Sequence, residues 1–154
     1  MTNQQKIFST IETHCLREDV KLTPKRKKIL DILYKSEAPL SAYEIADLYN
    51  HDEKKPMHAM SIYRILNLFL EINIIHKLAS QNKYIFCSHI TCNHNHVAQQ
   101  FLICKKCKKV KEIELNPALI NELNANIKKS GFQIDGPQLE IDCICEQCAR
   151  EDIL

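Results

Sequence analysis

Apolar residues recur at helical spacing through the first half of the chain, in three strong stretches. The first spans residues 3–17, the second follows Pro24, and the third lies within 60–73. Such spacing is typical of amphipathic helices that bury one face. In the third stretch the apolar residues share one side, and the opposite side carries Tyr63, Arg64, Asn67 and Glu71. We therefore expect a helix there whose polar face is free to meet a ligand.

Two local signals mark where helices begin. Thr23-Pro24 is typical of an N-cap followed by proline at the first helical position. Ser41-Ala-Tyr-Glu44 is a capping box, in which the two side chains satisfy free backbone N–H groups, so a further helix is expected from about 42 to 50. The polar stretch from His51 to Pro56 ends that helix.

After the helices the pattern changes to short β-prone runs. Residues 74–79 and 84–87 predict a hairpin with its turn at 80–83. Helices followed by such a hairpin are in the order of a winged helix, a relative of the helix-turn-helix in which the polar face of one helix enters the DNA major groove. Beyond Cys87 we expect a smaller α/β unit, with strands at 99–103, 109–114 and 132–142 and a helix near 117–129.

These patterns predict an α+β fold in two parts. The winged helix-turn-helix domain spans 1–87, a hinge spans 88–98, and the second domain spans 99–154. Neither part is expected to have a large core, so zinc and a partner chain are expected to contribute to stability.

Two Cys-x-x-Cys pairs in the second domain are the strongest chemical signal. Cys104 and Cys107 form one pair and Cys145 and Cys148 the other. Four thiolates brought together by two tight turns suit the tetrahedral coordination of Zn²⁺. Disulfides are the alternative, but the first twenty residues contain no apolar run of signal-peptide length, and no stretch approaches a membrane span. We therefore expect a cytoplasmic protein with a zinc site that holds its fold together.

The charge distribution adds a local basic patch. The net charge is only +2, but Lys21 and the run from Lys25 to Lys28 fall within eight residues. A patch of this kind is typical of a nucleic-acid contact or, more simply, of a solvated helix face.

The hairpin also predicts a second metal site. If Ala79 and Tyr84 flank its turn, His76 pairs directly with Cys87, and both side chains lie on one face; a slip of one residue would separate them. With His96 and Glu112 these residues would form a site that links the two domains. The alternative is that His76 only caps the hairpin. His89, Cys92 and His94 are possible extra ligands, or a weaker third site.

The chain resembles the ferric uptake regulator family over nearly its whole length, and most of all its zinc uptake regulator branch. The matching segments are Leu22-Thr-Pro-Lys-Arg26, Ser41-Ala-Tyr-Glu44, Ser61-Ile-Tyr-Arg64, His76-Lys77 with Cys87, and the two cysteine pairs. The resemblance implies a dimeric, zinc-responsive transcriptional repressor whose metal-loaded form binds AT-rich palindromic operator DNA. It also implies that the second domain serves homodimerisation as well as metal binding, with two zinc ions per chain.

The resemblance further implies residue roles. The four paired cysteines would hold the structural zinc, and His76, Cys87, His96 and Glu112 the regulatory zinc, with His94 and then His89 as alternatives to His96. DNA contacts are implied for Tyr43, Ser61, Tyr63 and Arg64, while Lys25 and Arg26 would contact phosphates. Ala38 stands where the iron and peroxide branches usually carry His, and the Cys87 thiolate suits zinc better than iron. Cys143 is either a free thiol or a substitute for Cys145, and Cys15 is structural or incidental.

Two other functions remain open from the sequence. One is an iron-, manganese- or peroxide-responsive regulator of the same family. The other is a thiol or metal enzyme, with Cys87 and His76 as nucleophile and base. An oxidoreductase would need a Cys-x-x-Cys pair at a helix N-terminus, and both pairs lie between predicted strands. We therefore expect no enzymatic activity, no small-molecule substrate and no membrane partner.

Overall fold

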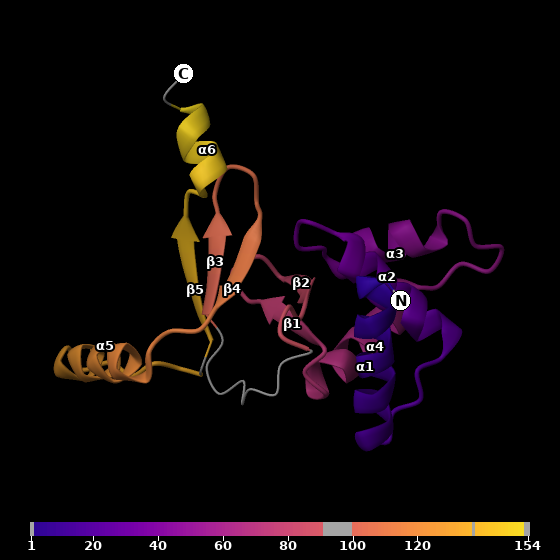
Figure 1. Cartoon of the computed structure of the whole chain (residues 1–154), viewed down its shortest axis with the longest axis horizontal. Coiled ribbons are helices and arrows are strands. Elements are labelled where there is room, and N and C mark those ends of the chain that lie inside the picture. The colour runs from indigo at the N-terminus through magenta and orange to yellow at the C-terminus, as the bar shows by residue number, and fades with distance from the viewer. Residues whose placement is uncertain (1, 91–99, 137, 153–154) are drawn as a thin grey trace. The chain divides into compact units, whose positions relative to one another are not determined.

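The computed structural model describes residues 2–90, 100–136 and 138–152. It divides into two compact units, Met1–Asn93 and His94–Leu154 (Figure 1). None of the described helices is long and apolar enough to cross a membrane.

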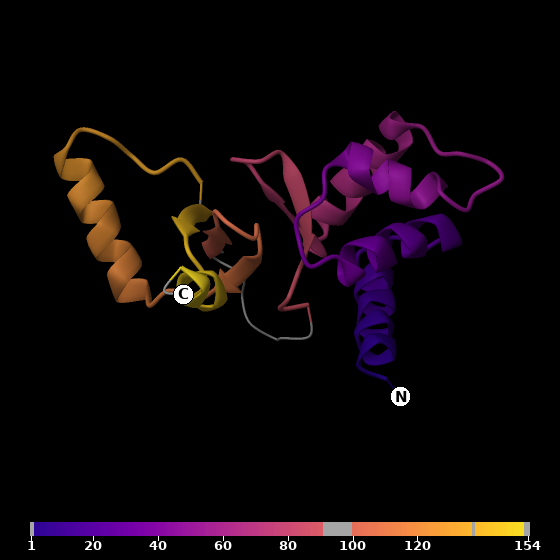
Figure 2. The same cartoon turned by 90° about the horizontal axis from the view of Figure 1, so that it is seen from above.

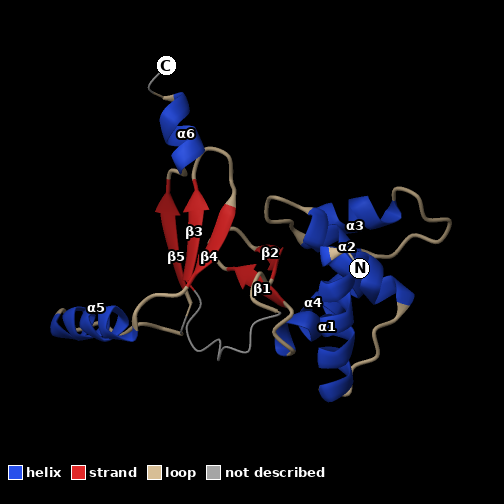
Figure 3. Ribbon diagram, viewed as in Figure 1, coloured by secondary structure: helices blue, strands red, loops and turns tan. Residues whose placement is uncertain are grey.

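The first unit consists of four helices and a β-hairpin, in the predicted order (Figure 3). Its elements are α1 (Asn3–Arg17), α2 (Pro24–Lys35), α3 (Ala42–Asn50), α4 (Ala59–Glu71), β1 (Ile75–Leu78) and β2 (Lys83–Phe86). The two sequence signals for helix starts are confirmed. The Thr23 hydroxyl accepts a hydrogen bond from the Arg26 N–H ahead of α2, and Ser41 and Glu44 form the reciprocal capping box of α3.

The first unit has one continuous apolar core. The expectation that neither part has a large core is therefore wrong for this unit. Buried side chains from all four helices and from the hairpin form one cluster. Ile62, Leu66 and Phe69 are the fully buried side of α4, as the periodicity predicts. Burying this much apolar surface gives the unit a hydrophobic stabilisation of its own.

The hairpin register differs from the predicted one. His76 pairs with Ile85, not with Cys87, and Leu78 pairs with Lys83 across the turn. The turn is still four residues long but lies one residue earlier, at 79–82, where Asn82 adopts a positive φ of 51° that asparagine tolerates. Moving both ends of the turn by one residue shifts the pairing by two, so His76 and Cys87 stay on one face as diagonal neighbours.

The second unit is a three-stranded sheet with two helices. Its elements are β3 (Gln100–Cys104), β4 (Val110–Ile113), α5 (Pro117–Lys129), β5 (Leu139–Cys143) and α6 (Glu146–Glu151). The central strand β3 pairs antiparallel with β4 and parallel with β5. The predicted strand at 132–142 is therefore too long at its start, and α6 was not predicted. Helix α5 buries none of its residues and lies apart from the sheet in both views (Figures 1 and 2).

Candidate metal centres and nucleic-acid interface

The four paired cysteines meet at one end of the sheet in the second unit. Their sulfur atoms all lie within 4.8 Å of one another, and the Sγ atoms of Cys107 and Cys145 are 3.7 Å apart. In a tetrahedral site with Zn–S bonds of about 2.3 Å, the sulfurs are separated by about 3.8 Å. The Cys107–Cys145 separation matches this value, so the cluster is suited to a zinc ion.

The surroundings of the cluster change the pKa values of two of its thiols. The backbone N–H of Cys145 donates to the Cys104 sulfur at 3.4 Å, and with the N–H of Cys107 it lowers the pKa of the Cys104 thiol to about 6. The Cys145 side chain, followed by burial, raises the pKa of the Cys148 thiol to about 12. One sulfur thus ionises readily while a neighbour keeps its proton, and binding of zinc to all four would release the remaining protons.

The second cysteine pair lies at the start of a helix, and the expectation that both pairs lie between strands is wrong for it. Cys145 is the N-cap of α6, and Cys148 lies in the first turn of that helix. The signal was present in the sequence, because Glu146 follows Cys145 as an acidic first-turn residue that favours a helix start. The position of this pair is thus compatible with a redox-active dithiol, whereas the clustering of all four sulfurs favours a bound metal.

Cys143 is not part of the described four-sulfur cluster. It pairs with Cys104 in the parallel ladder, and its thiol donates to the Ile141 carbonyl at 3.5 Å.

His76 and Cys87 lie together in the first unit. Both are buried, with 4% and 0% of their surface exposed, and the ring of His76 offers a nitrogen within 4.8 Å of the Cys87 sulfur. The backbone N–H of Cys87 donates to the Ile74 carbonyl at 3.0 Å, which continues the hairpin pairing past β2 and fixes the cysteine beside β1. A buried imidazole and a buried thiol at this spacing are a suitable pair of zinc donors.

Of the other predicted metal ligands, only Glu112 and His89 lie among the described residues. Glu112 is a half-buried residue of β4 in the second unit, opposite Phe101. His89 follows β2 in a turn and is half-buried. Cys92, His94 and His96 lie outside the described residues, as does most of the predicted hinge at 88–98.

The predicted polar face of α4 is exposed. Arg64, Asn67 and Glu71 all face solvent, and Arg64 makes no hydrogen bond or ion pair with the described part of the chain. Tyr63 is half-buried and packs partly against the core, while its ring meets that of Tyr43 edge-on at 6.3 Å.

The remaining predicted DNA contacts lie at or near helix starts. Tyr43, in the first turn of α3, is 65% exposed, and Ser61 is half-buried near the start of α4. The exposed guanidinium of Arg64 and the exposed ring of Tyr43 are suitable groups for contacts with base edges and phosphates.

The basic patch is partly satisfied within the protein. Arg26 donates to the Lys21 carbonyl, Lys27 pairs with Glu12, and Lys28 pairs with Glu53. Lys25 is exposed and makes no hydrogen bond or ion pair with any residue that the structure describes. Of this run, Lys25 is therefore the cation most available to a phosphate.

The chain is similar to known proteins over nearly its whole length. The zinc uptake regulation protein of Escherichia coli is 29% identical over 149 residues, which cover 97% of this chain and 85% of the relative. The ferric uptake regulation protein of Staphylococcus epidermidis is 31% identical over 132 residues, covering 86% of this chain and 88% of the relative. A solved structure described as a zinc uptake regulator complexed with zinc and DNA aligns over 100% of both chains, with a TM-score of 0.84 and 26% identity.

The model of one family, the ferric uptake regulator family, matches residues 17–142, from the end of α1 to β5. Since this match covers most of the chain, including α2 to α4, both buried donors of the hairpin and the first cysteine pair, the chain belongs to the ferric uptake regulator family.

Proposed function

We propose that this protein is a zinc-responsive transcriptional repressor, which binds operator DNA when loaded with zinc and so controls genes for zinc uptake. The observation that carries this proposal is the likeness, over the whole chain, to a zinc uptake regulator complexed with zinc and DNA. The similarity to the Escherichia coli zinc uptake regulation protein supports the same function.

Two zinc ions per chain would have different roles. Cys104, Cys107, Cys145 and Cys148 would hold one ion that stabilises the second unit. His76 and Cys87 would hold the other, with Glu112 and His96 completing four donors, or His94 or His89 in place of His96. When bound, the second ion would supply a link between donors of both units and so restrict the hinge at 88–98. Without this second ion, few dimers would present their two winged helices at the spacing of the operator half-sites. Zinc would therefore act by increasing the population of dimers that can bind DNA.

The DNA contacts divide by chemistry. Arg64 would donate to an acceptor at a purine edge, and Tyr43, Ser61 and Tyr63 would contact phosphates or thymine methyl groups. Lys25 and Arg26 would bind phosphates and make the affinity dependent on salt.

A homodimer would bind an AT-rich palindrome with one winged helix on each half-site. The exposed apolar side chains of Leu119, Phe132 and Ile141 in the second unit support such an assembly, because a partner chain would cover them.

The alternative within the family is a regulator of iron, manganese or peroxide responses. The Staphylococcus epidermidis relative is a ferric uptake regulation protein, so family membership alone does not decide the metal. Zinc is favoured because Cys87 offers a fully buried sulfur donor, and thiolates suit zinc better than harder divalent ions. We further propose that the protein acts in the cytoplasm and has no enzymatic activity.

The test is metal-dependent DNA binding by the full-length protein. A duplex selected from a random-sequence pool by the zinc-loaded protein is titrated with chelator-treated protein to which Zn²⁺, Fe²⁺ or Mn²⁺ is added. We expect tight binding only with zinc, and we expect His76→Ala and Cys87→Ala to abolish this zinc response. Binding that requires iron or manganese would assign the protein to another branch.

Cys15→Ala is the matched control for these two substitutions. Cys15 is a buried thiol in the core of the same unit and is not grouped with His76 and Cys87 as a possible metal ligand. The Cys15→Ala variant shows how much a small change in the core, by itself, affects DNA binding. A zinc response that survives in His76→Ala and Cys87→Ala would contradict the proposed regulatory site.

A further inference from the structure

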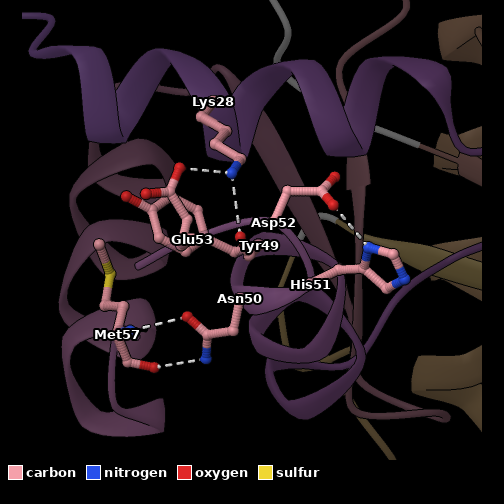
Figure 4. Close-up of polar contacts among 7 residues, drawn as sticks. All are labelled: Lys28, Tyr49, Asn50, His51, Asp52, Glu53 and Met57. Atoms are coloured by element: carbon pink, nitrogen blue, oxygen red, sulfur yellow. Dashed lines mark hydrogen bonds and ion pairs between the residues drawn. The ribbon is translucent and has the colours of Figure 1, made fainter. Parts of the chain in front are cut away.

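The segment between α3 and α4, residues 51–58, is longer than the three- or four-residue turn common in helix-turn-helix proteins. We call residues 51–57 the α3–α4 loop. It contains five charged or ionisable side chains in succession, His51 to Lys55, followed by Pro56. A long polar loop at the surface is usually free to move, but this one is held at both ends and in its middle (Figure 4).

The two ends of the loop are joined by one side chain. The Asn50 amide donates from Nδ2 to the Met57 carbonyl at 3.0 Å, and its Oδ1 accepts from the Met57 N–H at 2.7 Å. Asparagine here satisfies two backbone groups that the loop would otherwise leave to water. Met57 in turn packs against the core of the first unit, so the closed end of the loop is anchored.

A second contact holds the middle of the loop from α2. Lys28 donates to the Glu53 carboxylate at 2.6 Å and to the Tyr49 carbonyl at 3.0 Å, and its ammonium lies 4.6 Å from the centre of the Tyr49 ring. Figure 4 shows Lys28 reaching from its helix to both partners. Lys28 is therefore engaged within the protein, although it belongs to the basic patch.

These contacts leave the loop with an outward positive charge. Glu53 is neutralised by Lys28, and Asp52 accepts from the His51 ring at 2.9 Å. Lys54 and Lys55 are exposed and have no hydrogen bond or ion pair with the described residues. Both acidic groups of the loop are thus paired, and its two lysines are not.

We propose that the α3–α4 loop is a braced phosphate-binding element, in which Lys54 and Lys55 contact the DNA backbone beside the bases that α4 reads. The inference rests on the proposed DNA-binding function. The position of the loop supports this contact. The loop leads directly into α4, and residues around the start of a recognition helix lie near the sugar-phosphate backbone. The braces from Asn50 and Lys28 limit the entropy that the loop would lose when it binds.

Salt dependence separates this contact from a general charge effect. Affinity for the duplex selected by the wild-type protein is measured over a range of salt concentrations for Lys54→Ala/Lys55→Ala. We expect the slope of log K against log salt to be less steep by about 1 for each lysine removed. Lys128→Ala/Lys129→Ala, which removes two exposed lysines at the end of α5, is the matched control and should keep the wild-type slope.

Sequence dependence gives a second readout. Phosphate contacts weaken binding to all sequences alike, so the ratio of affinities for the selected duplex and a scrambled one should not change in the loop variant. An unchanged salt slope, or a loss confined to the selected duplex, would overturn the inference. Failure of the wild-type protein to select any duplex in the presence of zinc would instead contradict the proposed function itself.

The brace is tested by a double-mutant cycle. Asn50→Ala is combined with the two lysine substitutions, and folding is monitored by circular dichroism. If Asn50 positions the lysines, their removal should weaken DNA binding less in the Asn50→Ala background than in the wild-type background. Strictly additive effects would show that the loop needs no brace to bind phosphate. The lysine variant alone tests the phosphate contact if Asn50→Ala does not fold, because both lysines are exposed.

Discussion

Cys143 and Cys145 are two residues apart but have different surroundings. Cys143 ends β5, and its thiol bonds to a backbone carbonyl of the same strand. Cys145 is the N-cap of α6, and its sulfur lies 3.7 Å from that of Cys107. The change from strand to helix between them points only Cys145 toward the other three ligands.

Zinc content should therefore distinguish the two cysteines. We expect Cys145→Ser to lose the structural zinc, because three sulfurs and a weakly acidic hydroxyl bind zinc poorly, whereas Cys143→Ser should keep the wild-type stoichiometry. Zinc per chain can be measured by elemental analysis of purified protein, with Cys15→Ser as a control for loss of a buried thiol. The reverse pattern would make Cys143 the ligand.

At the scale of secondary-structure elements, local signals are predictable and long-range pairing is not. Thr23-Pro24 and the Ser41–Glu44 box place two helix starts correctly, because a cap needs only residues within one turn. The hairpin register depends on which residues leave the strand for the turn, and there a shift of one position moved the pairing by two. The short α6 carries no apolar periodicity, so the acidic Glu146 in its first turn was the only sequence signal that favoured a helix there.

The same distinction between local and long-range features explains which parts of the candidate metal sites could be predicted from the sequence. Cysteine spacing alone predicts the four-sulfur cluster, because one pair lies at a turn and the other in the first turn of a helix, and both geometries bring the two sulfurs together locally. The sequence predicts a direct His76–Cys87 pair, and this register is wrong. The two side chains still share a face, because a shift of two residues preserves the alternation of side chains along a strand. The contact of Lys28 with Glu53 joins α2 to the α3–α4 loop across 25 residues, and no sequence pattern predicts it.

The start of α3 should make stability depend on pH. The Glu44 carboxylate accepts the Ser41 N–H at 2.6 Å and bonds to Lys83 of β2. The Ser41 bond, with a smaller contribution from Lys83, lowers the pKa of Glu44 below its ordinary 4.5. Because folding lowers this pKa, the stabilisation is complete above pH 4.5 and is lost as pH falls through the folded-state value.

Glu44→Gln should therefore destabilise the first unit by about 0.5 kcal/mol near neutral pH, and the difference from wild type should shrink below pH 4.5. Unfolding by urea, followed by tyrosine fluorescence, measures this, because all five tyrosines lie in the first unit and the chain has no tryptophan. Glu37→Gln, which changes an exposed glutamate without a partner among the described residues, should show no such dependence. A constant difference for Glu44→Gln across this range would mean that its charge does not matter.

At the scale of the whole molecule, the two units differ in what holds them together. The first unit has a continuous apolar cluster that includes every helix. In the described part of the second unit, the buried side chains are Gln100, Phe101, Ile103, Cys104 and Cys148, two of them zinc-ligand candidates. A unit with so little buried apolar surface depends on cross-links or a partner.

Removal of all zinc should consequently unfold the second unit and leave the first one folded. Zinc bound to four thiolates contributes on the order of 10 kcal/mol to a small domain, more than the few buried side chains of this sheet can replace. Hydrogen exchange measured by mass spectrometry should show that the amides of β3 and β5 lose protection after treatment with a strong chelator, while tyrosine fluorescence stays native. Cys148→Ser should reproduce this loss without chelator, and His76→Ala should not, because His76 lies in the unit with its own core. A sheet that stays protected in zinc-free protein would mean that association between chains, not the metal, holds the second unit together.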